Sequence, residues 1–242
     1  MELIGKYHFV TESYLLDFRG RVTIPMMGNY MLHAASSHAA TRGFGFSDMT
    51  EKNTAWVLTR LAMEIYRYPV MSEPVTLYTW IDDVGRLFTQ RCFQLTDAAD
   101  VILAYARSIW GAIDIATRRP TMLDIAALGK YIADRPCPIE KPGKIAAIEN
   151  ESFGIPYQVK YSDLDINGHF NSIKYIEHLL DMFDIGFFRN KEVQRFEISY
   201  LSEGMYGMPL TLHKQEMLPD EYALAVCCEG KAICRAKVQF AL

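Results

Sequence analysis

Two segments of the chain have the hydrophobic pattern of a helix that is buried on most sides. In the segment 171–183, the polar side chains fall on one narrow stripe at helical spacing, and the other positions are apolar. The polar residues of this stripe are Lys174, Glu177, His178 and Asp181. The segment 26–40 shows a similar arrangement. A helix that is apolar around most of its circumference is normally surrounded by protein. Each half of the chain is therefore predicted to contain one long buried helix.

Strand-like runs follow each predicted helix. Polar and apolar residues alternate at 106–110 and at 236–240, which is typical of half-buried antiparallel strands. Other runs are rich in aromatic and β-branched residues. The predicted strands span 61–68, 87–95, 101–113, 195–201, 222–228 and 232–240.

A faint internal repeat accompanies these elements. Pro-Val-Thr-Leu at 74–77 returns as Pro-Leu-Thr-Leu at 209–212, within a similar order of predicted elements. Between the halves, the segment 128–150 contains three prolines and several basic residues, and prolines suit a sheet interior poorly. We therefore predict an N-terminal domain at 1–127, a linker at 128–150 and a C-terminal domain at 151–242. The fold class is α+β, with two antiparallel sheets that each curl round a central helix.

The composition of the 242 residues is that of an ordinary globular protein, since half of them are hydrophobic and 22% are charged. With 25 Lys+Arg against 29 Asp+Glu, the net charge of −4 argues against a nucleic-acid-binding protein. Five cysteines without a C-x-x-C pair are interpreted as reduced thiols. The first residues lack a signal peptide's apolar core, and the uncharged stretch 22–41 is too polar to span a membrane. We therefore expect a cytoplasmic protein.

The most unusual local sequence is Tyr-Ser-Asp-Leu-Asp-Ile-Asn-Gly-His-Phe-Asn at 161–171. Asp165, Asn167 and His169 are two residues apart, so an extended segment would place their side chains on one side. They precede a predicted helix, and the unpaired amides of a helix N-terminus favour a developing negative charge. A carboxylate, an amide and an imidazole beside such amides suit acyl-transfer hydrolysis, because they supply a base and stabilise an oxyanion.

The polar residues of the chain have three other interpretations. The Asp-x-Asp-x-Asn-Gly run at 163–168 matches the first half of a calcium-binding loop, but Lys174 stands where that loop needs a carboxylate. The segment is also compatible with a capped helix start, in which Asn and Asp side chains only bind backbone amides. A serine nucleophile is disfavoured, because Gly-Phe-Ser-Asp at 45–48 breaks the G-x-S-x-G pattern.

The segment 163–176, Asp-Leu-Asp-Ile-Asn-Gly-His-Phe-Asn-Ser-Ile-Lys-Tyr-Ile, resembles the D-x-N-x-H-x-N-N-x-K-Y signature of acyl-acyl-carrier-protein thioesterases. Three blocks of the N-terminal half are similar to other parts of that family: 54–60, 64–69 and 117–120. The resemblance thus covers nearly the whole chain in the right order. It implies two hot-dog domains in tandem, each a sheet wrapped round a long helix. It also implies hydrolysis of the thioester between a fatty acyl chain and acyl carrier protein, with no cofactor and no metal.

The resemblance further implies which residues act. Asp165, Asn167 and His169 match D-x-N-x-H, and Glu203 stands 203 − 169 = 34 residues later, in the place of the family's catalytic Glu. The plant enzymes have Cys directly after this Glu, whereas this chain has Gly204, so we expect attack by water assisted by a carboxylate. In this hypothesis Asp165 and Glu203 orient and deprotonate water, or Asp165 attacks directly. His169 moves a proton, and Asn167 with helix amides holds the thioester oxygen.

The family places the acyl chain in an apolar slot of the N-terminal domain. The candidate lining residues are Met26, Met27, Tyr30, Met31 and Trp56. Because acyl carrier protein is acidic, docking would require a positive patch, for which the basic linker and Arg118-Arg119 are candidates. The sequence leaves open a coenzyme A thioesterase of the same fold, a hot-dog dehydratase acting on 3-hydroxyacyl thioesters, and a non-catalytic acyl-binding module. It also allows either a monomer or a homodimer.

Overall fold

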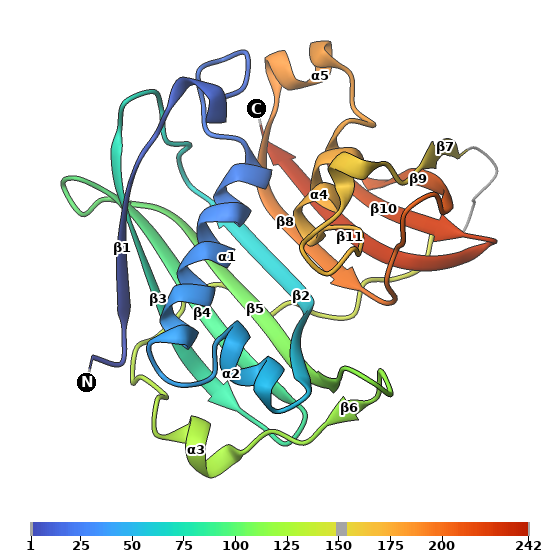
Figure 1. Ribbon diagram of the computed structural model, residues 1–242. Coiled ribbons are helices and arrows are strands. Elements are labelled where there is room, and N and C mark those ends of the chain that lie inside the picture. The colour runs from blue at the N-terminus through green and yellow to red at the C-terminus, as the bar shows by residue number, and fades with distance from the viewer. Residues whose placement is uncertain (1, 149–153, 242) are drawn as a thin grey trace. The chain divides into compact units, whose positions relative to one another are not determined.

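The structure is a computed structural model that describes residues 2–148 and 154–241. The chain divides into two compact units, Met1–Lys141 and Pro142–Leu242, here called unit 1 and unit 2 (Figure 1). This division falls inside the predicted linker, 128–150. The last residues of that linker and the start of the predicted C-terminal domain lie outside the described residues, so the predicted domain limits stay predictions.

Unit 1 contains an antiparallel sheet in the order β1-β3-β4-β5-β2. The strands are β1 (Gly5–Val10), β2 (Thr54–Ile65), β3 (Pro74–Val84), β4 (Phe88–Asp97) and β5 (Ile102–Asp114), and the short β6 (Pro120–Thr121) pairs with β5. The helices are η1 (Ser13–Leu15), α1 (Ile24–Ala40), α2 (Phe46–Glu51) and α3 (Ile125–Gly129). Figure 1 shows α1 crossing one face of this sheet. Thr23 caps α1 by accepting a hydrogen bond from the Met26 amide, and Pro25 stands in the first turn, where a proline is tolerated.

Unit 2 contains an antiparallel sheet in the order β7-β9-β10-β11-β8. The strands are β7 (Ile155–Gln158), β8 (Glu192–Tyr200), β9 (Pro209–Leu218), β10 (Glu221–Cys228) and β11 (Lys231–Ala241). The helices are η2 (Tyr161–Asp163), α4 (Ser172–Leu180) and α5 (Ile185–Asn190). The first strand of each unit thus pairs with the third, and the repeated Pro74 and Pro209 each begin that third strand. The predicted repeat and the tandem hot-dog fold are confirmed.

The long helix predicted at 171–183 is wrong at its C-terminal end. α4 ends at Leu180, and a second short helix, α5, begins after Asp184. The Asp184 carboxylate accepts a hydrogen bond from the Phe187 amide (2.8 Å) and so starts a new helix instead of continuing the old one. Phe183 is buried between the two helices and packs against Phe240.

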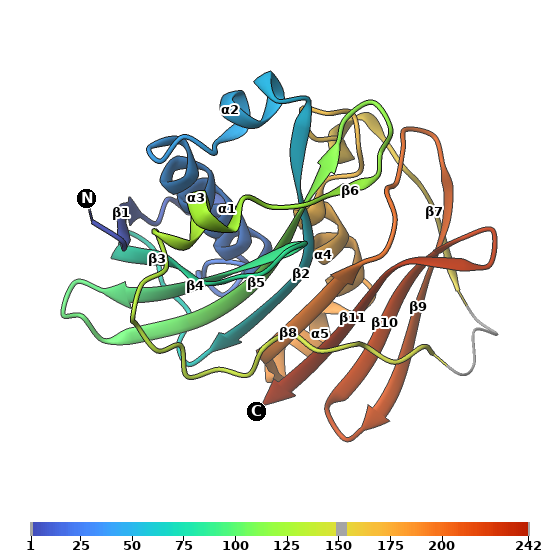
Figure 2. The ribbon, with the colours of Figure 1, turned by 90° about the horizontal axis from the view of Figure 1, so that it is seen from below.

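The predicted linker is extended but firmly packed in the part that belongs to unit 1. After α3, the chain follows the yellow-green path in Figure 2 without regular structure, and Cys137 and Ile139 are buried against Trp80. Arg107 donates hydrogen bonds to the carbonyls of Cys137 (2.7 Å) and Ile139 (2.9 Å), and its guanidinium pairs with Asp82 (2.8 Å). This part of the linker is therefore a strap bound to the sheet.

A polar cluster is buried in the core of unit 1. His38 on α1 donates from Nε2 to the Leu3 carbonyl (3.2 Å) and accepts at Nδ1 from the Arg91 guanidinium (3.0 Å), which also donates to Thr79 (3.2 Å). Burial, with a further contribution from the Arg91 charge, lowers the pKa of His38 to about 3. The imidazole is therefore neutral at neutral pH, as its acceptor role toward Arg91 requires.

Candidate active site

The predicted acid–amide–imidazole trio lies in a tight turn between η2 and α4. Asp165 Oδ1 accepts hydrogen bonds from the amides of Asn167 (2.8 Å) and His169 (3.0 Å), and the Asp165 amide donates to the His169 carbonyl (2.8 Å). Gly168 has φ +79°, which favours glycine because it has no Cβ. The expectation of an extended segment with three side chains on one side is therefore wrong, because the Asp165 side chain closes the turn on itself.

The segment after β8 pairs with this turn and brings Glu203 to it. The Phe170 amide donates to the Gly204 carbonyl (2.8 Å), and His169 forms an antiparallel bridge with Met205. His169 Nε2 lies 3.7 Å from Glu203 Oε2, and the two side chains are 22% and 41% exposed. This distance is within ion-pair range but longer than a hydrogen bond. The structure therefore brings the imidazole and the distant carboxylate together at a surface that solvent reaches.

Asn167 and the helix start behave differently from the expectation. Asn167 is exposed, and its side chain makes no hydrogen bond among the described residues. The first turn of α4 is capped by Asn171, whose Oδ1 accepts from the Ile173 amide (2.8 Å). That amide is thus already bound, so the helix start offers fewer amides for an oxyanion than the sequence alone suggested.

Gly204 is tightly enclosed in this arrangement. A Cβ atom at this position would lie 2.8 Å from the Phe170 Cβ and 2.9 Å from the Tyr175 hydroxyl. A cysteine here would therefore require its neighbours to shift. This close packing gives a local reason for the glycine that follows Glu203 in this chain.

A buried carboxylate lies directly under the turn. Asp163 is 2% exposed and accepts hydrogen bonds from the Tyr157 hydroxyl (2.6 Å), the Lys160 amide (2.7 Å) and His178 Nε2 (2.9 Å). Burial raises the pKa of Asp163, but the hydrogen bonds from Tyr157, Lys160 and His178 outweigh it and hold that pKa below its ordinary value. Both oxygens of Asp163 bind protein donors, which does not fit the calcium alternative.

In the sequence, Asp163 belongs to the possible calcium loop and His178 to the polar stripe of the helix, so no spacing relates the two residues. The sequence does contain a second register of the internal repeat, in which the turn at 165–170 corresponds to 17–22 with an offset of 165 − 17 = 148. In unit 1, Asp17 Oδ1 accepts from the Arg19 amide (2.8 Å) and the Arg21 amide (3.1 Å). Unit 1 therefore repeats the turn but carries two arginines where unit 2 has Asn167 and His169.

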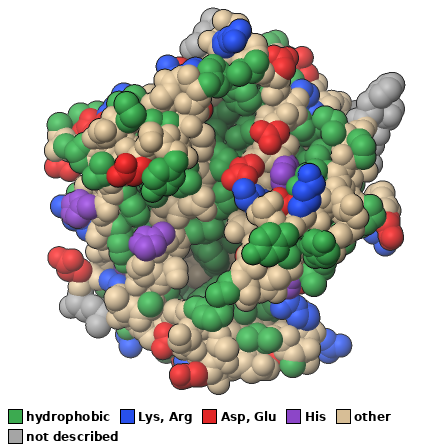
Figure 3. Space-filling model, turned by 45° about the horizontal axis from the view of Figure 1, so that its top comes forward, with side chains coloured by type: hydrophobic (Ala, Val, Ile, Leu, Met, Phe, Trp, Pro, Cys, Tyr) green, Lys and Arg blue, Asp and Glu red, His purple; other side chains and the backbone are tan. Residues whose placement is uncertain are grey.

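Large hydrophobic side chains are exposed around the unit 2 turn. They belong to Tyr161, Ile166, Met205 and Tyr206. On the face of the molecule drawn in Figure 3, hydrophobic side chains likewise lie among charged ones. Exposed apolar groups beside polar reacting groups are typical of a site that binds a partly apolar ligand.

Comparison with known proteins identifies the family. Residues 3–127 match the model of the acyl-ACP thioesterase N-terminal domain, and residues 146–242 match that of the acyl-ACP thioesterase C-terminal domain. The chain belongs to the acyl-ACP thioesterase family. The resemblance to this family that the sequence motifs indicated is thus confirmed over both halves of the chain.

Solved structures agree with this assignment. An acyl-ACP thioesterase from Bacteroides thetaiotaomicron is 42% identical with a TM-score of 0.94, and the match covers 99% of this chain and 98% of that one. A 12:0-ACP thioesterase from Umbellularia californica has the same fold, with a TM-score of 0.90 over 100% of this chain and 98% of that one, at 22% identity.

Among curated relatives, a chloroplastic palmitoyl-acyl carrier protein thioesterase from Arabidopsis thaliana is 25% identical over 215 residues. The match covers 83% of this chain and 52% of that protein. A chloroplastic oleoyl-acyl carrier protein thioesterase from Coriandrum sativum is 26% identical over 216 residues, which are 82% of this chain and 58% of that protein. The chain therefore spans about half the length of these curated members of the acyl-ACP thioesterase family.

The five predicted acyl-pocket residues of this family member lie in unit 1 but do not share one environment. Met27 and Met31 are buried on α1, and Met26 is half-buried. The Tyr30 ring stacks on Phe9 of β1 at 4.3 Å. The Trp56 indole donates to the Phe44 carbonyl (2.8 Å) and packs with a separate cluster that includes Phe44 and Leu128. Their role in binding stays a prediction.

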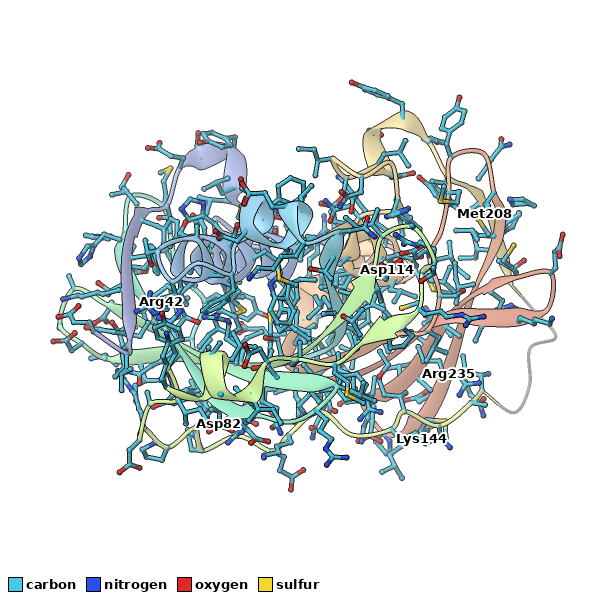
Figure 4. All side chains as sticks on the ribbon, turned by 60° about the horizontal axis from the view of Figure 1, so that its bottom comes forward. Arg42, Asp82, Asp114, Lys144, Met208 and Arg235 are labelled. Atoms are coloured by element: carbon cyan, nitrogen blue, oxygen red, sulfur yellow. The ribbon has the colours of Figure 1, made fainter. Side chains whose placement is uncertain are left out.

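The basic residues proposed for docking also differ among themselves. The Arg135 guanidinium lies over the rings of Tyr78 (4.9 Å) and Trp80 (4.8 Å) and donates to Gln94 (2.6 Å). It therefore fastens the strap to the sheet of unit 1. Arg118 and Arg119 are exposed. Lys141 and Lys144 are exposed as well, and Lys144 is labelled in Figure 4. These four cations are exposed to solvent, whereas Arg135 packs against two aromatic rings.

Among the described helices, none has both the length and the apolar character needed to span a membrane.

Proposed function

We propose that the chain hydrolyses the thioester that joins a fatty acyl group to acyl carrier protein. The observation that carries this proposal is the 3.7 Å approach of Glu203 to His169, beside the turn that Asp165 closes. Family membership supports the reaction type, and the names of the curated relatives support a fatty acyl group and acyl carrier protein as the substrate's two parts.

The geometry suggests a division of labour between the two carboxylates. Asp165 Oδ1 is bound to two amides, which leaves Oδ2 to hold a water molecule in place. Glu203 is more exposed and lies beside His169, so it is placed to take the proton of that water as its oxygen attacks the thioester carbon. The side-chain amide of Asn167 stabilises the oxyanion, and the C–S bond then breaks. His169, which lies 3.7 Å from Glu203, takes this proton from Glu203 and delivers it to the leaving sulfur, which gives a free fatty acid and the carrier thiol and restores both residues.

The acyl chain would lie in unit 1 along the buried face of α1, lined by Met27 and Met31 and bordered by Met26, Tyr30 and Trp56. Acyl carrier protein would dock on exposed cations such as Arg118, Arg119, Lys141 and Lys144. The reaction would take place in the cytoplasm, where the free cysteines of this chain would stay reduced. The active form would be a monomer or a homodimer.

The proposal is tested by assaying one acyl group on acyl carrier protein and on coenzyme A, with wild type and Asp165→Asn. We expect the carrier-bound substrate to be preferred and its hydrolysis to fall at least about 10²-fold in Asp165→Asn. The matched control is Asp17→Asn, which alters the corresponding turn of unit 1 and should leave the rate within about two-fold. A near-normal rate in Asp165→Asn would refute the assigned chemistry, and a preference for coenzyme A would refute the assigned carrier.

A further inference from the structure

We propose that Tyr157, Asp163 and His178 form a positioning triad that fixes the reacting turn of unit 2 against the start of α4. None of the three is assigned to the reacting groups. The inference rests on the proposed function of that turn, because a positioning role has meaning only where geometry controls a reaction.

Unit 1 supplies an internal comparison at the same three places. With the offset of 148, Tyr157, Asp163 and His178 correspond to three residues of apolar or aromatic character. The counterparts are Phe9, Leu15 and Tyr30. The two ring pairs have the same spacing. The ring centroids of Phe9 and Tyr30 lie 4.3 Å apart, and those of Tyr157 and His178 also lie 4.3 Å apart. The two units therefore pack this corner alike, but only unit 2 places a carboxylate there.

The polar set is not needed to form the turn. The hydrogen bonds that close the two turns have nearly the same lengths. In unit 1, the two backbone amides donate to Asp17 at 2.8 and 3.1 Å, and in unit 2 the corresponding amides donate to Asp165 at 2.8 and 3.0 Å. Unit 1 thus builds the turn over Leu15. The three hydrogen bonds to Asp163 offset its desolvation, and because unit 1 forms the same turn without a carboxylate at this place, the turn itself does not require Asp163.

The two units differ at the bond that joins this corner to the helix. In unit 2, the amide of the capping residue Asn171 donates to the Asp163 carbonyl at 2.8 Å. In unit 1, the corresponding bond from Thr23 to Leu15 measures 3.4 Å. Asp163, held by three donors, therefore sits closer to the helix start than its counterpart does. The triad tightens the joint from which the reacting turn projects.

Phe170 connects the triad to the Glu203 segment. Its ring lies 5.7 Å from that of His178 and 6.4 Å from that of Tyr157. Its amide holds the carbonyl of Gly204 at 2.8 Å, next to Glu203. A change in the triad would therefore move Phe170 and, with it, the distance between Glu203 and His169. A misplacement of about 1 Å at a reacting group can cost about 10²-fold in rate.

The test imports the unit 1 residues into unit 2 as Tyr157→Phe/Asp163→Leu/His178→Tyr. Because unit 1 packs this set around the same turn, we expect a folded protein. We expect kcat for the acyl-carrier substrate to fall about 10- to 100-fold while KM changes less than about two-fold. A folded triple variant with normal kcat would overturn the proposal, and so would an equal effect on KM.

Two single variants keep the test decisive if the triple variant does not fold. His178→Gln retains an amide donor for Asp163, whereas His178→Leu removes the donor. We expect kcat to be largely kept in His178→Gln and reduced in His178→Leu, and equal rates in both would overturn the proposal. Glu203→Gln, assayed alongside, separates the two claims. If it is active, the proposed chemistry fails, whereas if it is inactive and the triad variants are normal, only the triad fails.

Discussion

The turns at 17–22 and 165–170 have the same backbone and different chemistry. Each is closed by an aspartate that accepts two backbone amides, and each precedes a capped helix. Unit 1 then places Arg19 and Arg21 where unit 2 places the amide and the imidazole. The aspartate is therefore a structural part of this turn in both units. A carboxylate there does not by itself indicate a reacting site.

The partner segments of the two turns show the same contrast. In unit 1, the Val22 amide donates to the Pro69 carbonyl (2.9 Å), as Phe170 does to Gly204 in unit 2. Tyr68 therefore stands at the place of Glu203, and it is buried. Unit 1 thus has the scaffold without a second carboxylate, and unit 2 combines that scaffold with all the groups that the proposed hydrolysis requires.

The largest effect is expected when the two polar residues of the unit 2 turn are replaced by their unit 1 counterparts, as Asn167→Arg/His169→Arg. The backbone bonds to Asp165 do not depend on these side chains, so we expect the fold to be kept. Hydrolysis of acyl-carrier substrate should fall by about 10³-fold or more, since the proton carrier and the oxyanion donor are both removed. The control is Arg19→Asn/Arg21→His, which should keep the rate within about two-fold. A steady-state assay measures the hydrolysis rate, and circular dichroism checks that the variant is folded. An active double-arginine variant would contradict the claim that the side chains of the unit 2 turn carry out the reaction and those of the unit 1 turn do not.

A smaller effect is expected where unit 2 has no room for a side chain. Gly204→Ala would bring a methyl group against Phe170 and the Tyr175 hydroxyl, so we expect kcat to fall about ten-fold and the free energy of unfolding to fall by about 1–3 kcal/mol. Gly129→Ala is the matched control, because no heavy atom lies within 4 Å of a Cβ at that position. Urea unfolding and the assay measure both changes. Equal behaviour of the two variants would show that the enclosure of Gly204 is unimportant.

The smallest expected effect concerns the core of unit 1 and its dependence on pH. His38 has a pKa of about 3 in the folded protein and the ordinary value of 6.5 when unfolded, so the unfolded chain binds more protons between these values. Stability from this group is therefore complete above pH 6.5 and is lost as pH falls toward 3. Between pH 7.5 and 5.0 we expect a loss of about 2 kcal/mol, measured by urea unfolding. His38→Gln should remove this part of the pH dependence, and an unchanged slope in that variant would exclude the buried imidazole as its cause.

Much of the fold could be predicted from the sequence because it depends on local patterns. The alternation at 106–110 and 236–240 marks strands β5 and β11, and the prolines at 74 and 209 mark the starts of equivalent strands. The sequence pattern does not reveal the break after Leu180, because apolar residues continue through it and only the Asp184 cap starts a new helix.

The candidate site could be predicted in its residues more than in its geometry. The spacing of Asp165, Asn167 and His169 indicated an extended segment, yet the Asp165 side chain folds back on the backbone. The place of Glu203 came from the family resemblance. The role of Asp163 depends on contacts with β7 and α4, which no local pattern contains.

The most direct measurement is the hydrolysis rate of Glu203→Gln, which keeps the shape of the side chain and removes its capacity to accept a proton. The account predicts a loss of at least about 10²-fold in kcat for acyl-carrier substrate, with an unchanged unfolding midpoint. The matched unit 1 variant, Tyr68→Phe, should keep wild-type kcat. A Glu203→Gln protein that turns over substrate at the wild-type rate would contradict the claim that this carboxylate, beside His169, activates the attacking water.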